Sequence, residues 1–257
     1  MITSAGNPKL RLIRELLDRS RTRRQEGAFI IEGIRSFEEA PKDQILAVFV
    51  SESFRKRYPE IEGEVVKEEI FQKLSDVRTP QGIMAAVKIK RYSLDDILRP
   101  GMKGSRLYLV LEGIQDPGNV GTMIRTAEGA GVAGIIMDRG TADAYAPKVV
   151  RSTMGSIFRV PFLYTDDLSF VLSRMKQCGV YVYAAEMGGE EEFGQTEYQE
   201  KAAFLIGNEG NGLSSESLKK ADKQISIPMM GRVKSLNAAI SSALFLYDYR
   251  RQWKNAK

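Results

Sequence analysis

Three short segments in the second half of the chain combine glycine and asparagine with single charged residues, which suits ligand binding. Each segment follows an apolar run and leads into a helical pattern, so each can place backbone N–H groups and polar side chains at one mouth. They are Asn119-Val-Gly-Thr-Met-Ile-Arg125, Ile206-Gly-Asn-Glu-Gly-Asn-Gly212 and Ile227-Pro-Met-Met-Gly-Arg-Val-Lys-Ser-Leu-Asn237. These residue types favour a ligand held by the main chain, with a guanidinium and a carboxylate close by.

The first segment predicts a helix that starts at Val120 and has Asn119 at its N-cap. A turn-rich loop, Glu112-Gly-Ile-Gln-Asp-Pro-Gly118, comes before it. Arg125 then lies near the second turn of the helix, where only its long side chain reaches back to the mouth. A capping asparagine and an ordinary surface arginine are the alternative interpretation.

The second and third segments predict two more loops at the ends of strands. Glycines packed as densely as those of residues 207–212 form either a plain turn or a place where the backbone approaches a ligand closely. Glu209, in the middle of this loop, could orient Arg125 through a bidentate pair. In the third segment Ser235 is the expected N-cap of a long helix. Asn237 would face the mouth, since asparagine is unfavourable inside a helix.

In type, order and spacing the three segments together resemble the signature motifs of the SpoU/TrmH family of RNA 2′-O-ribose methyltransferases. The resemblance implies a SPOUT-type α/β domain with a deep trefoil knot, which ordinary topology rules would forbid, and a homodimer formed through the knot region. It also implies S-adenosylmethionine as the cofactor. The positions that match the cofactor-binding loops are Gly207, Ile227, Met229 and Leu236.

The resemblance further implies catalytic roles for Arg125, Asn119, Glu209, Ser235 and Asn237. The matching arginine lies beside the ribose hydroxyl that is methylated, and the matching asparagine helps to hold the site. Because a guanidinium is hard to deprotonate in a protein, we expect Arg125 to stabilise developing alkoxide charge and clamp a phosphate instead of acting as a base.

Composition removes several other classes of function. The chain has no histidine and one cysteine, Cys178. Ser-His-Asp hydrolysis, an intrachain disulfide and nearly all ordinary zinc sites are therefore excluded, and we expect no metal. No long apolar run or signal-peptide core is present, so we expect a cytoplasmic protein without membrane contact. A net charge of +5 favours a polyanionic partner.

One glycine pattern points to a different cofactor but lies in the wrong context. Gly129, Gly131 and Gly134 match the dinucleotide-binding pattern, which should follow a strand and open a helix. Here the glycines close a predicted helix and lead into a strand, so Gly129 or Gly131 is better interpreted as a left-handed helix terminus. Two alternatives to a methyltransferase remain. One is an enzyme with a different cofactor, such as a dehydrogenase, and the other is an RNA-binding protein without catalytic activity.

The alternation of strands and helices predicts two α/β domains, at 1–90 and 105–257, joined by a polar linker at 91–104. In the first domain, residues 28–31, 45–50 and 83–89 are predicted as strands, and 8–19, 34–40 and 68–74 as helices. In the second, the predicted strands are 107–111, 134–137, 180–183, 203–206 and 224–227. The predicted helices there are 119–130, 146–154, 168–177, 214–221 and 236–250. A mostly parallel sheet with helices on both faces follows for this domain.

The first domain is the expected RNA-binding part. Residues 1–26 hold seven basic residues against three acidic ones, and we expect Lys9, Arg11, Arg14, Arg23 and Arg24 to contact RNA. A solvated helix face is the alternative. The pattern from Asn7-Pro-Lys9 to Gly27-Ala-Phe-Ile-Ile-Glu-Gly33 resembles the RNA-binding domain appended to SpoU/TrmH enzymes that modify 23S ribosomal RNA. Transfer RNA remains the alternative substrate.

Overall fold

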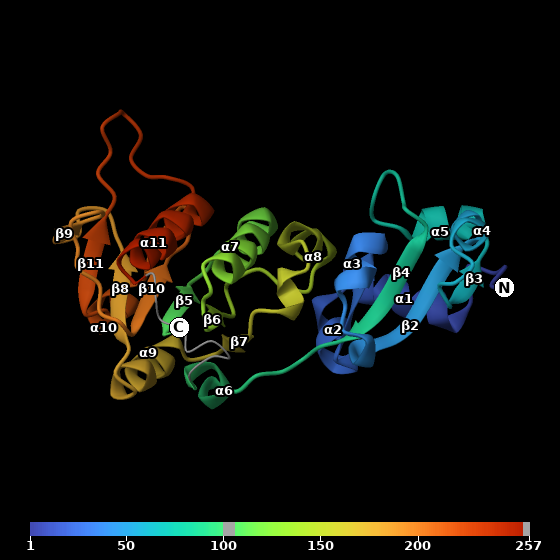
Figure 1. The fold of residues 1–257 in the computed structure, drawn as a ribbon, viewed down its shortest axis with the longest axis horizontal. Coiled ribbons are helices and arrows are strands. Elements are labelled where there is room, and N and C mark those ends of the chain that lie inside the picture. Colours follow the sequence, from blue (N-terminus) through green and yellow to red (C-terminus); the bar gives the residue numbers. More distant parts are fainter. Residues whose placement is uncertain (100–105, 254–257) are drawn as a thin grey trace. The chain divides into compact units, whose positions relative to one another are not determined.

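The computed structural model describes residues 1–99 and 106–253, and the chain divides into two compact units (Figure 1). Unit 1 comprises Met1–Lys90 together with Asp143–Phe158, and unit 2 comprises Arg91–Ala142 and Arg159–Lys257. The segment Asp143–Phe158 thus folds with the first unit, although by sequence it lies inside the predicted second domain. The predicted domain bounds themselves stay a prediction.

Unit 1 is built on a four-stranded mixed sheet. Its strands are β1 (Ala28–Glu32), β2 (Ile45–Ser51), β3 (Glu64–Val66) and β4 (Ile83–Lys88), arranged in the order β1-β4-β2-β3. β4 is antiparallel to both of its neighbours, and β3 is parallel to β2. Val66 is the only buried residue of β3, so this short strand has no periodic signal in the sequence.

Helices cover both faces of this sheet. They are α1 (Pro8–Asp18), α2 (Ser20–Glu26), α3 (Ile34–Glu39), α4 (Glu52–Arg57) and α5 (Glu68–Leu74), with a 3₁₀ turn at Lys42–Gln44. Asn7 caps α1 and Pro8 opens it, which is the favoured start of a helix. α1 and α5 pack on the face that carries Ile30 and Met84, and α3 and α4 pack on the face of Val50 and Ile83.

Unit 2 contains a seven-stranded sheet whose pairings are all parallel among the described strands. The strands are β5 (Leu107–Leu111), β6 (Gly134–Asp138), β7 (Phe162–Thr165), β8 (Tyr181–Ala185), β9 (Glu191–Glu192), β10 (Ala202–Ile206) and β11 (Lys223–Ser226). Their order is β7-β6-β5-β10-β8-β11-β9. The predicted mostly parallel α/β architecture is therefore confirmed.

The helices of unit 2 pack on both faces of its sheet. They are α6 (Leu94–Leu98), α7 (Pro117–Gly129), α9 (Leu168–Gln177), α10 (Ser215–Lys220) and α11 (Ala238–Gln252). α6 and α9 cover Val110 and Leu205 on one face. On the other face, α11 stacks Phe245 on Phe204 of β10, with ring centroids 5.5 Å apart, and runs beside α7.

The structure tests two sequence-based predictions, one for the linker at 91–104 and one for the glycines that follow α7. The predicted linker contains the short helix α6, whose Ile97 and Leu98 are buried in the core of unit 2, while residues 100–104 lie outside the described part of the chain. Gly131 follows the end of α7 with a φ of +66°, and β6 begins at Gly134. This confirms the left-handed helix terminus in place of a dinucleotide-binding turn.

Candidate active site

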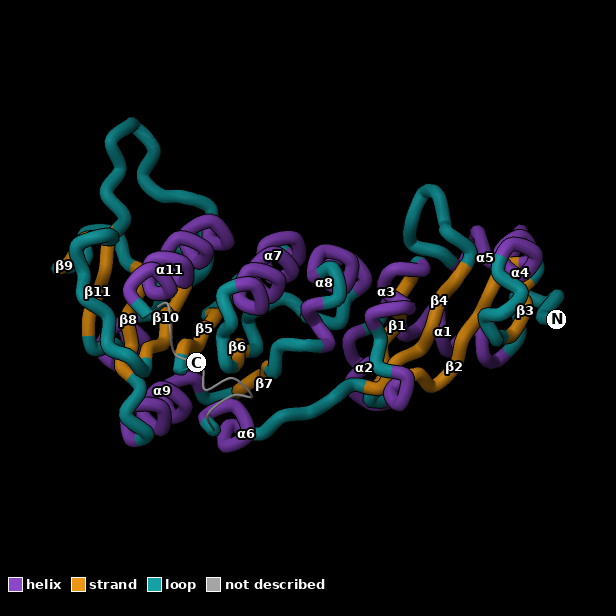
Figure 2. The backbone as a smooth tube through the Cα atoms, viewed as in Figure 1, coloured by secondary structure: helices purple, strands orange, loops and turns teal. Residues whose placement is uncertain are grey.

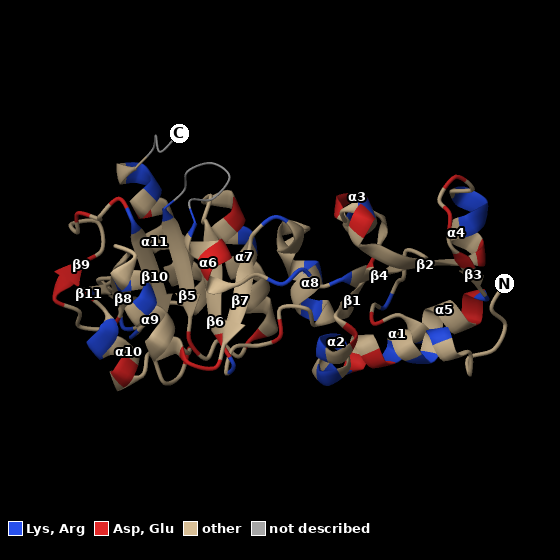
Figure 3. Ribbon diagram, turned by 90° about the horizontal axis from the view of Figure 1, so that it is seen from below, with Lys and Arg blue, Asp and Glu red and all other residues tan. Residues whose placement is uncertain are grey.

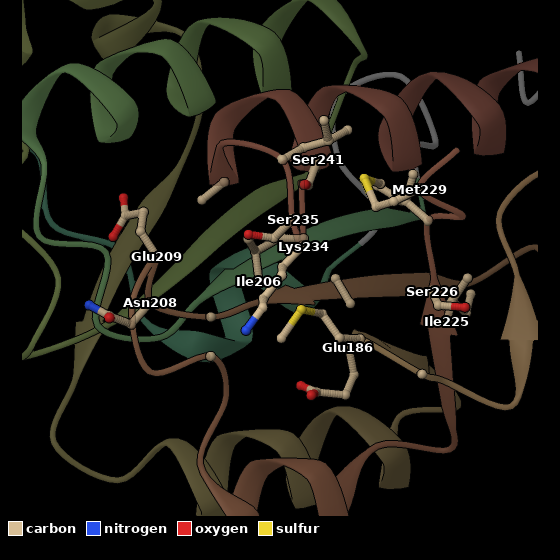
Figure 4. A pocket seen from close by; sticks show the side chains of 18 of the residues that line it. Glu186, Ile206, Asn208, Glu209, Ile225, Ser226, Met229, Lys234, Ser235 and Ser241 are labelled. Atoms are coloured by element: carbon tan, nitrogen blue, oxygen red, sulfur yellow. The ribbon is translucent and has the colours of Figure 1, made fainter. Parts of the chain in front are cut away.

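A pocket of 460 Å³ opens at the carboxyl ends of β8, β10 and β11, which are neighbours in the sheet of unit 2 (Figure 4). Its size is within the usual range for small-molecule sites. Loops at the strand ends of an open parallel sheet meet at one edge, which explains why segments distant in sequence share this pocket. The lining comprises residues 185–188, 206–212, 225–229, 234–236, 238, 241 and 245.

The loop after β10 is a tight turn held by Asn208. Its main-chain N–H and C=O both bond to Gly212, and its Oδ1 accepts from the N–H groups of Gly210 and Asn211 at 2.8 and 2.9 Å. Its Nδ2 donates to the Gly113 carbonyl at 2.7 Å, tying this loop to the end of β5. A Cβ at Gly207 would lie 2.5 Å from the Gly212 carbonyl carbon, so glycine is required there.

Sequence reasoning missed the loop after β8. The Glu186 N–H donates to the carbonyl of Ile225 at 3.0 Å, and Glu186, Met187 and Gly188 line the pocket. A Cβ at Gly189 would lie 2.7 Å from the backbone of Gln224. The signal in the sequence was the glycine pair Gly188-Gly189, separated by two residues from a buried strand and similar to the glycine-rich loop at residues 207–212.

The first motif is capped one turn earlier than predicted. Asp116 is the N-cap of α7, because its Oδ1 accepts from the Asn119 N–H at 2.8 Å and Pro117 occupies the first helical position. The predicted cap at Asn119 was wrong. An aspartate followed by proline is the stronger helix start, because the missing N–H of proline is not needed there. The side chain of Asn119 is therefore available for other contacts.

The third motif is also capped differently from the prediction. Asn237, not Ser235, caps α11, and its Oδ1 accepts from the N–H groups of Ala239 and Ile240 at 2.9 and 3.3 Å. Its Nδ2 donates to Asn119 Oδ1 at 3.0 Å. Asn119 Nδ2 in turn donates to Glu209 Oε1 at 2.7 Å. One hydrogen-bonded chain, Asn237–Asn119–Glu209, thus joins all three motifs.

Arg125 lies exposed on α7 and has no hydrogen-bond or ion-pair partner among residues 1–99 and 106–253. The predicted bidentate pair with Glu209 is not formed, because the Glu209 carboxylate accepts from Asn119 instead. An exposed guanidinium without an internal partner keeps its donors available for an external anion.

The pocket residues fit S-adenosylmethionine. All four positions predicted to bind the cofactor, Gly207, Ile227, Met229 and Leu236, line the pocket. The only ionisable side chains in the lining are Glu186, Glu209 and Lys234, which can face the sulfonium, ammonium and carboxylate charges of that molecule. Ser235 also lines the pocket, whereas Asn119, Arg125 and Asn237 do not.

Arg23 was predicted to contact RNA, but the structure buries it inside unit 1. Its side chain is 4% exposed, and its Nη1 donates to the carbonyls of Leu16 and Leu17 at 2.6 and 2.9 Å. Its Nε and Nη2 donate to Asp143 Oδ2 at 2.9 and 2.8 Å. A buried arginine with every contact directed inward joins structural elements and does not present its charge to RNA.

The other four predicted RNA-binding residues lie at the surface. Lys9 pairs with Glu64, which partly neutralises its charge. Arg11, Arg14 and Arg24 are exposed on α1 and α2. Figure 3 shows these two helices with alternating blue and red bands. Their contact with RNA stays a prediction.

The described part of the chain has neither a cluster suited to a metal ion nor a helix suited to crossing a membrane. No cluster of three or more His, Cys, Asp or Glu side chains that could hold a metal ion occurs within the described ranges. No helix in the described part of the chain is long and apolar enough to cross a membrane.

Both parts of the chain match models of known protein families. A model of the SpoU rRNA Methylase family matches residues 106–247, and a model of the MRM3-like substrate binding domain matches residues 7–85. The chain belongs to the SpoU rRNA methylase family. This membership confirms the predicted enzyme class, an RNA methyltransferase that uses S-adenosylmethionine, and makes the trefoil knot the expected topology of unit 2.

Individual relatives of this family match nearly the whole chain. The 23S rRNA (guanosine(2553)-2′-O)-methyltransferase RlmP of Bacillus subtilis is 32% identical over 97% of this chain and 98% of its own length. The S-adenosylmethionine-bound rRNA methyltransferase of Sinorhizobium meliloti is 29% identical and covers 97% of each chain, with a TM-score of 0.82. AviRb of Streptomyces viridochromogenes, also solved with the cofactor, is 25% identical over 98% of this chain and all of its own, with a TM-score of 0.85.

Proposed function

We propose that this chain transfers the methyl group of S-adenosylmethionine to a ribose 2′-hydroxyl of 23S ribosomal RNA. The observation that carries the proposal is the Asn237–Asn119–Glu209 chain, which ties the rim of the cofactor pocket to the helix that bears Arg125. The similarity to RlmP over nearly the full length of both chains supports ribosomal RNA as the substrate. Such a substrate belongs to the cytoplasm.

In the mechanism, Gly207, Ile227, Met229 and Leu236 would hold the cofactor through their main chain and side chains. Bound S-adenosylmethionine supplies a methyl carbon that its sulfonium already makes electrophilic. The protein therefore needs mainly to position the ribose oxygen and stabilise it while its proton passes to solvent water as the new C–O bond forms and the S–CH₃ bond breaks. Its tasks are orientation and electrostatics, not acid–base chemistry by histidine, which the chain lacks.

Arg125 performs the electrostatic task in this proposal. Its exposed guanidinium stabilises charge on the ribose oxygen and clamps a neighbouring phosphate. Asn119 fixes the start of α7 against the pocket, while Glu209 and Asn237 hold Asn119 from two sides. Ser235, exposed in the loop before α11, lies at the rim of the pocket and would position the ribose.

The test is transfer of labelled methyl to RNA from cells that lack this gene. Large-subunit rRNA, small-subunit rRNA and tRNA are assayed separately and digested to nucleosides. We expect a labelled 2′-O-methyl nucleoside from the large-subunit fraction only. Label in tRNA would instead support the tRNA alternative, and label on a base would refute ribose methylation. No label and no cofactor binding would support an RNA-binding protein without turnover.

The role of Arg125 is tested by replacing it with lysine and glutamine. Both variants should keep the wild-type affinity for S-adenosylmethionine, because Arg125 does not line the pocket. Turnover should fall by about 100-fold or more in the glutamine variant, since a charge-stabilising donor is lost. Full turnover by the lysine variant would contradict the proposal that the planar Arg125 guanidinium binds a phosphate through two donors at once.

A homodimer is the assembly that we propose. Ile240 and Tyr247 on α11 are 53% and 54% exposed, and together with Thr122 and Thr126 of α7 they line an apolar hollow. Apolar surface of this kind is typical of subunit interfaces. Ile240→Arg should convert the dimer to a monomer in light scattering, whereas Leu46→Arg, at a 57% exposed position in unit 1, should not. A wild-type monomer would contradict the proposal.

A further inference from the structure

The segment Asp143–Phe158 belongs to the RNA-binding unit although it interrupts the methyltransferase sequence. Two ion pairs and one contact between aromatic rings hold it on unit 1. Asp143 accepts from buried Arg23, the Tyr145 ring lies 4.8 Å from that of Phe29, and Arg151 donates twice to Asp76 Oδ2 at 3.0 Å. The helix of this segment, α8 (Pro147–Thr153), is thereby fixed as part of the surface of unit 1.

This segment packs on the face of the sheet opposite to α1. Side chains of neighbouring strand residues point to opposite faces, so Phe29 and Ile30 of β1 face different helical layers. Ile30 packs against α1, which carries Arg11 and Arg14. Phe29 packs against Tyr145 and Phe158 of the inserted segment. Unit 1 therefore has a second surface, on the side of its sheet opposite to the basic residues of α1.

The outer side of α8 is basic. Val149, Val150 and Thr153 are buried, which leaves Lys148 exposed and Arg151 and Ser152 half-buried. Residues 144–158 contain no acidic side chain. Arg151 is paired with Asp76, and exposed Arg78 follows two residues later in the loop between α5 and β4, which shows in teal in Figure 2. Figure 3 shows α8 with blue bands.

Met154, which ends α8, combines exposure with backbone strain. Its φ is +49°, the only positive φ of a non-glycine residue among the described residues. The left-handed region is unfavourable for any residue with a Cβ, and glycine would avoid the cost. The side chain is 53% exposed, whereas Thr153 and Ser156 beside it are buried. The left-handed conformation closes α8, and the Met154 N–H donates to the Arg151 carbonyl at 3.3 Å, a cap for which glycine is the favoured residue. A methionine kept at this position in place of glycine places a large apolar side chain on the surface, which is a sign of function.

We propose that Lys148, Arg151 and Met154 form a contact surface for the ribosomal RNA substrate. Lys148 binds a backbone phosphate beside Arg151, whose pair with Asp76 holds the guanidinium in place, and the flexible, polarisable Met154 side chain packs against an unstacked base. This inference rests on the proposed function for the identity of its partner. It assigns RNA contact to the α8 side of unit 1, opposite to the Arg11 and Arg14 side.

The decisive variant is Met154→Gly in the full-length chain, measured with large-subunit rRNA from cells that lack the gene. Because glycine relieves the strained φ, the melting temperature should stay equal to that of the wild type or rise. Affinity for rRNA should nevertheless fall by about tenfold, the loss expected for one base contact. A second variant, Met154→Asn, also tolerates this backbone conformation and should show the same loss.

Charge variants test the phosphate contact independently. Lys148→Gln should reduce the slope of log affinity against log salt by about one unit. Arg11→Gln and Arg14→Gln, on the opposite face, are matched controls that should change the slope less. Leu46→Ala is the control for loss of an exposed apolar side chain in unit 1. Cofactor affinity should be unchanged in every variant, because the pocket contains none of these residues.

The outcomes separate this inference from the proposed function. Wild-type protein that neither binds nor methylates rRNA would overturn both. Normal rRNA affinity in Met154→Gly and Lys148→Gln, with a wild type that does methylate rRNA, would overturn the α8 surface alone. A larger slope change in the Arg11 and Arg14 variants would place the RNA on α1 instead. A lower melting temperature of Met154→Gly would refute the strain on which the argument depends.

Discussion

At the scale of single residues, the pocket at the ends of β8, β10 and β11 is shaped by close backbone approach more than by charged groups. Gly207 lies against the Gly212–Leu213 backbone. Asn208 makes four hydrogen bonds within the turn that follows and a fifth to the Gly113 carbonyl. Such a turn holds its main-chain groups in place before any ligand arrives. Preorganisation of this kind reduces the ordering cost of binding.

Gly207→Ala should weaken binding of S-adenosylmethionine by about tenfold or more, because the new Cβ forces the turn out of shape. Gly210→Ala is the matched control in the same loop, since its Cβ would meet only Asn208 Oδ1 at 3.4 Å. Calorimetric titration of both variants provides the measurement. Equal affinities of the two variants would show that the close approach at Gly207 does not shape the pocket.

Asn237 has two separable tasks, capping α11 and holding Asn119. Asn237→Ala removes both and should lower the free energy of unfolding by about 1 kcal/mol, the usual value of an N-cap. Asn237→Asp keeps an acceptor for the N–H groups of Ala239 and Ile240 but loses the donor to Asn119. Urea unfolding should therefore be near wild type for Asn237→Asp, while methyl transfer falls. Wild-type turnover in this variant would remove Asn119 positioning from the mechanism.

At the scale of elements, one buried arginine joins three parts of unit 1. Arg23 on α2 binds the last carbonyls of α1 and the carboxylate that begins the inserted segment. The last carbonyls of a helix lack internal partners, so a cation placed there satisfies them and complements the helix dipole. Asp143 is the starting point of the segment that carries α8.

Arg23→Gln should destabilise unit 1 by about 3 kcal/mol, because it leaves Asp143 and two helix carbonyls without a charged partner. Arg21→Gln, an exposed position on the same helix, is the control and should stay within about 0.5 kcal/mol of the wild type. Denaturant unfolding measures both changes. An Arg23 variant that remains fully stable but loses RNA affinity would restore Arg23 as an RNA contact.

At the scale of the whole molecule, the compact unit around the first 90 residues also includes Asp143–Phe158. The Phe29 side of β1 is covered by Tyr145 and Phe158, which arrive from the middle of the methyltransferase sequence. β1 lies at the edge of its sheet, and its outer side would otherwise be open to solvent. The two units therefore cannot be separated by one cut in the chain.

A fragment of residues 1–90 should unfold at a lower temperature and bind more hydrophobic dye than the same fragment joined to residues 143–158 by a flexible linker. Loss of the Tyr145 and Phe158 packing and of the Asp143 pair is the physical reason. Circular dichroism during heating compares the two fragments. Identical melting curves would show that the inserted segment contributes nothing to the stability of unit 1.

The sequence by itself determined the order of most of the longer strands and helices, the parallel character of the larger sheet and two of the loops that line the pocket, those after β10 and β11. Those features follow from local periodicity and from glycine-rich loops at strand ends, which act within a few residues. Short elements such as β3 and β9 were beyond this reasoning because they contain too few buried residues to show a period.

Only the tertiary structure decided which partner each polar side chain takes. Arg23 and Arg24 are neighbours with the same charge in the sequence, yet one is buried against Asp143 and the other is exposed. Asn119 and Asn237 could each have capped a helix, but only Asn237 does so, and its free amide then bonds to Asn119. Such choices depend on groups more than a hundred residues away, whose position no local pattern records.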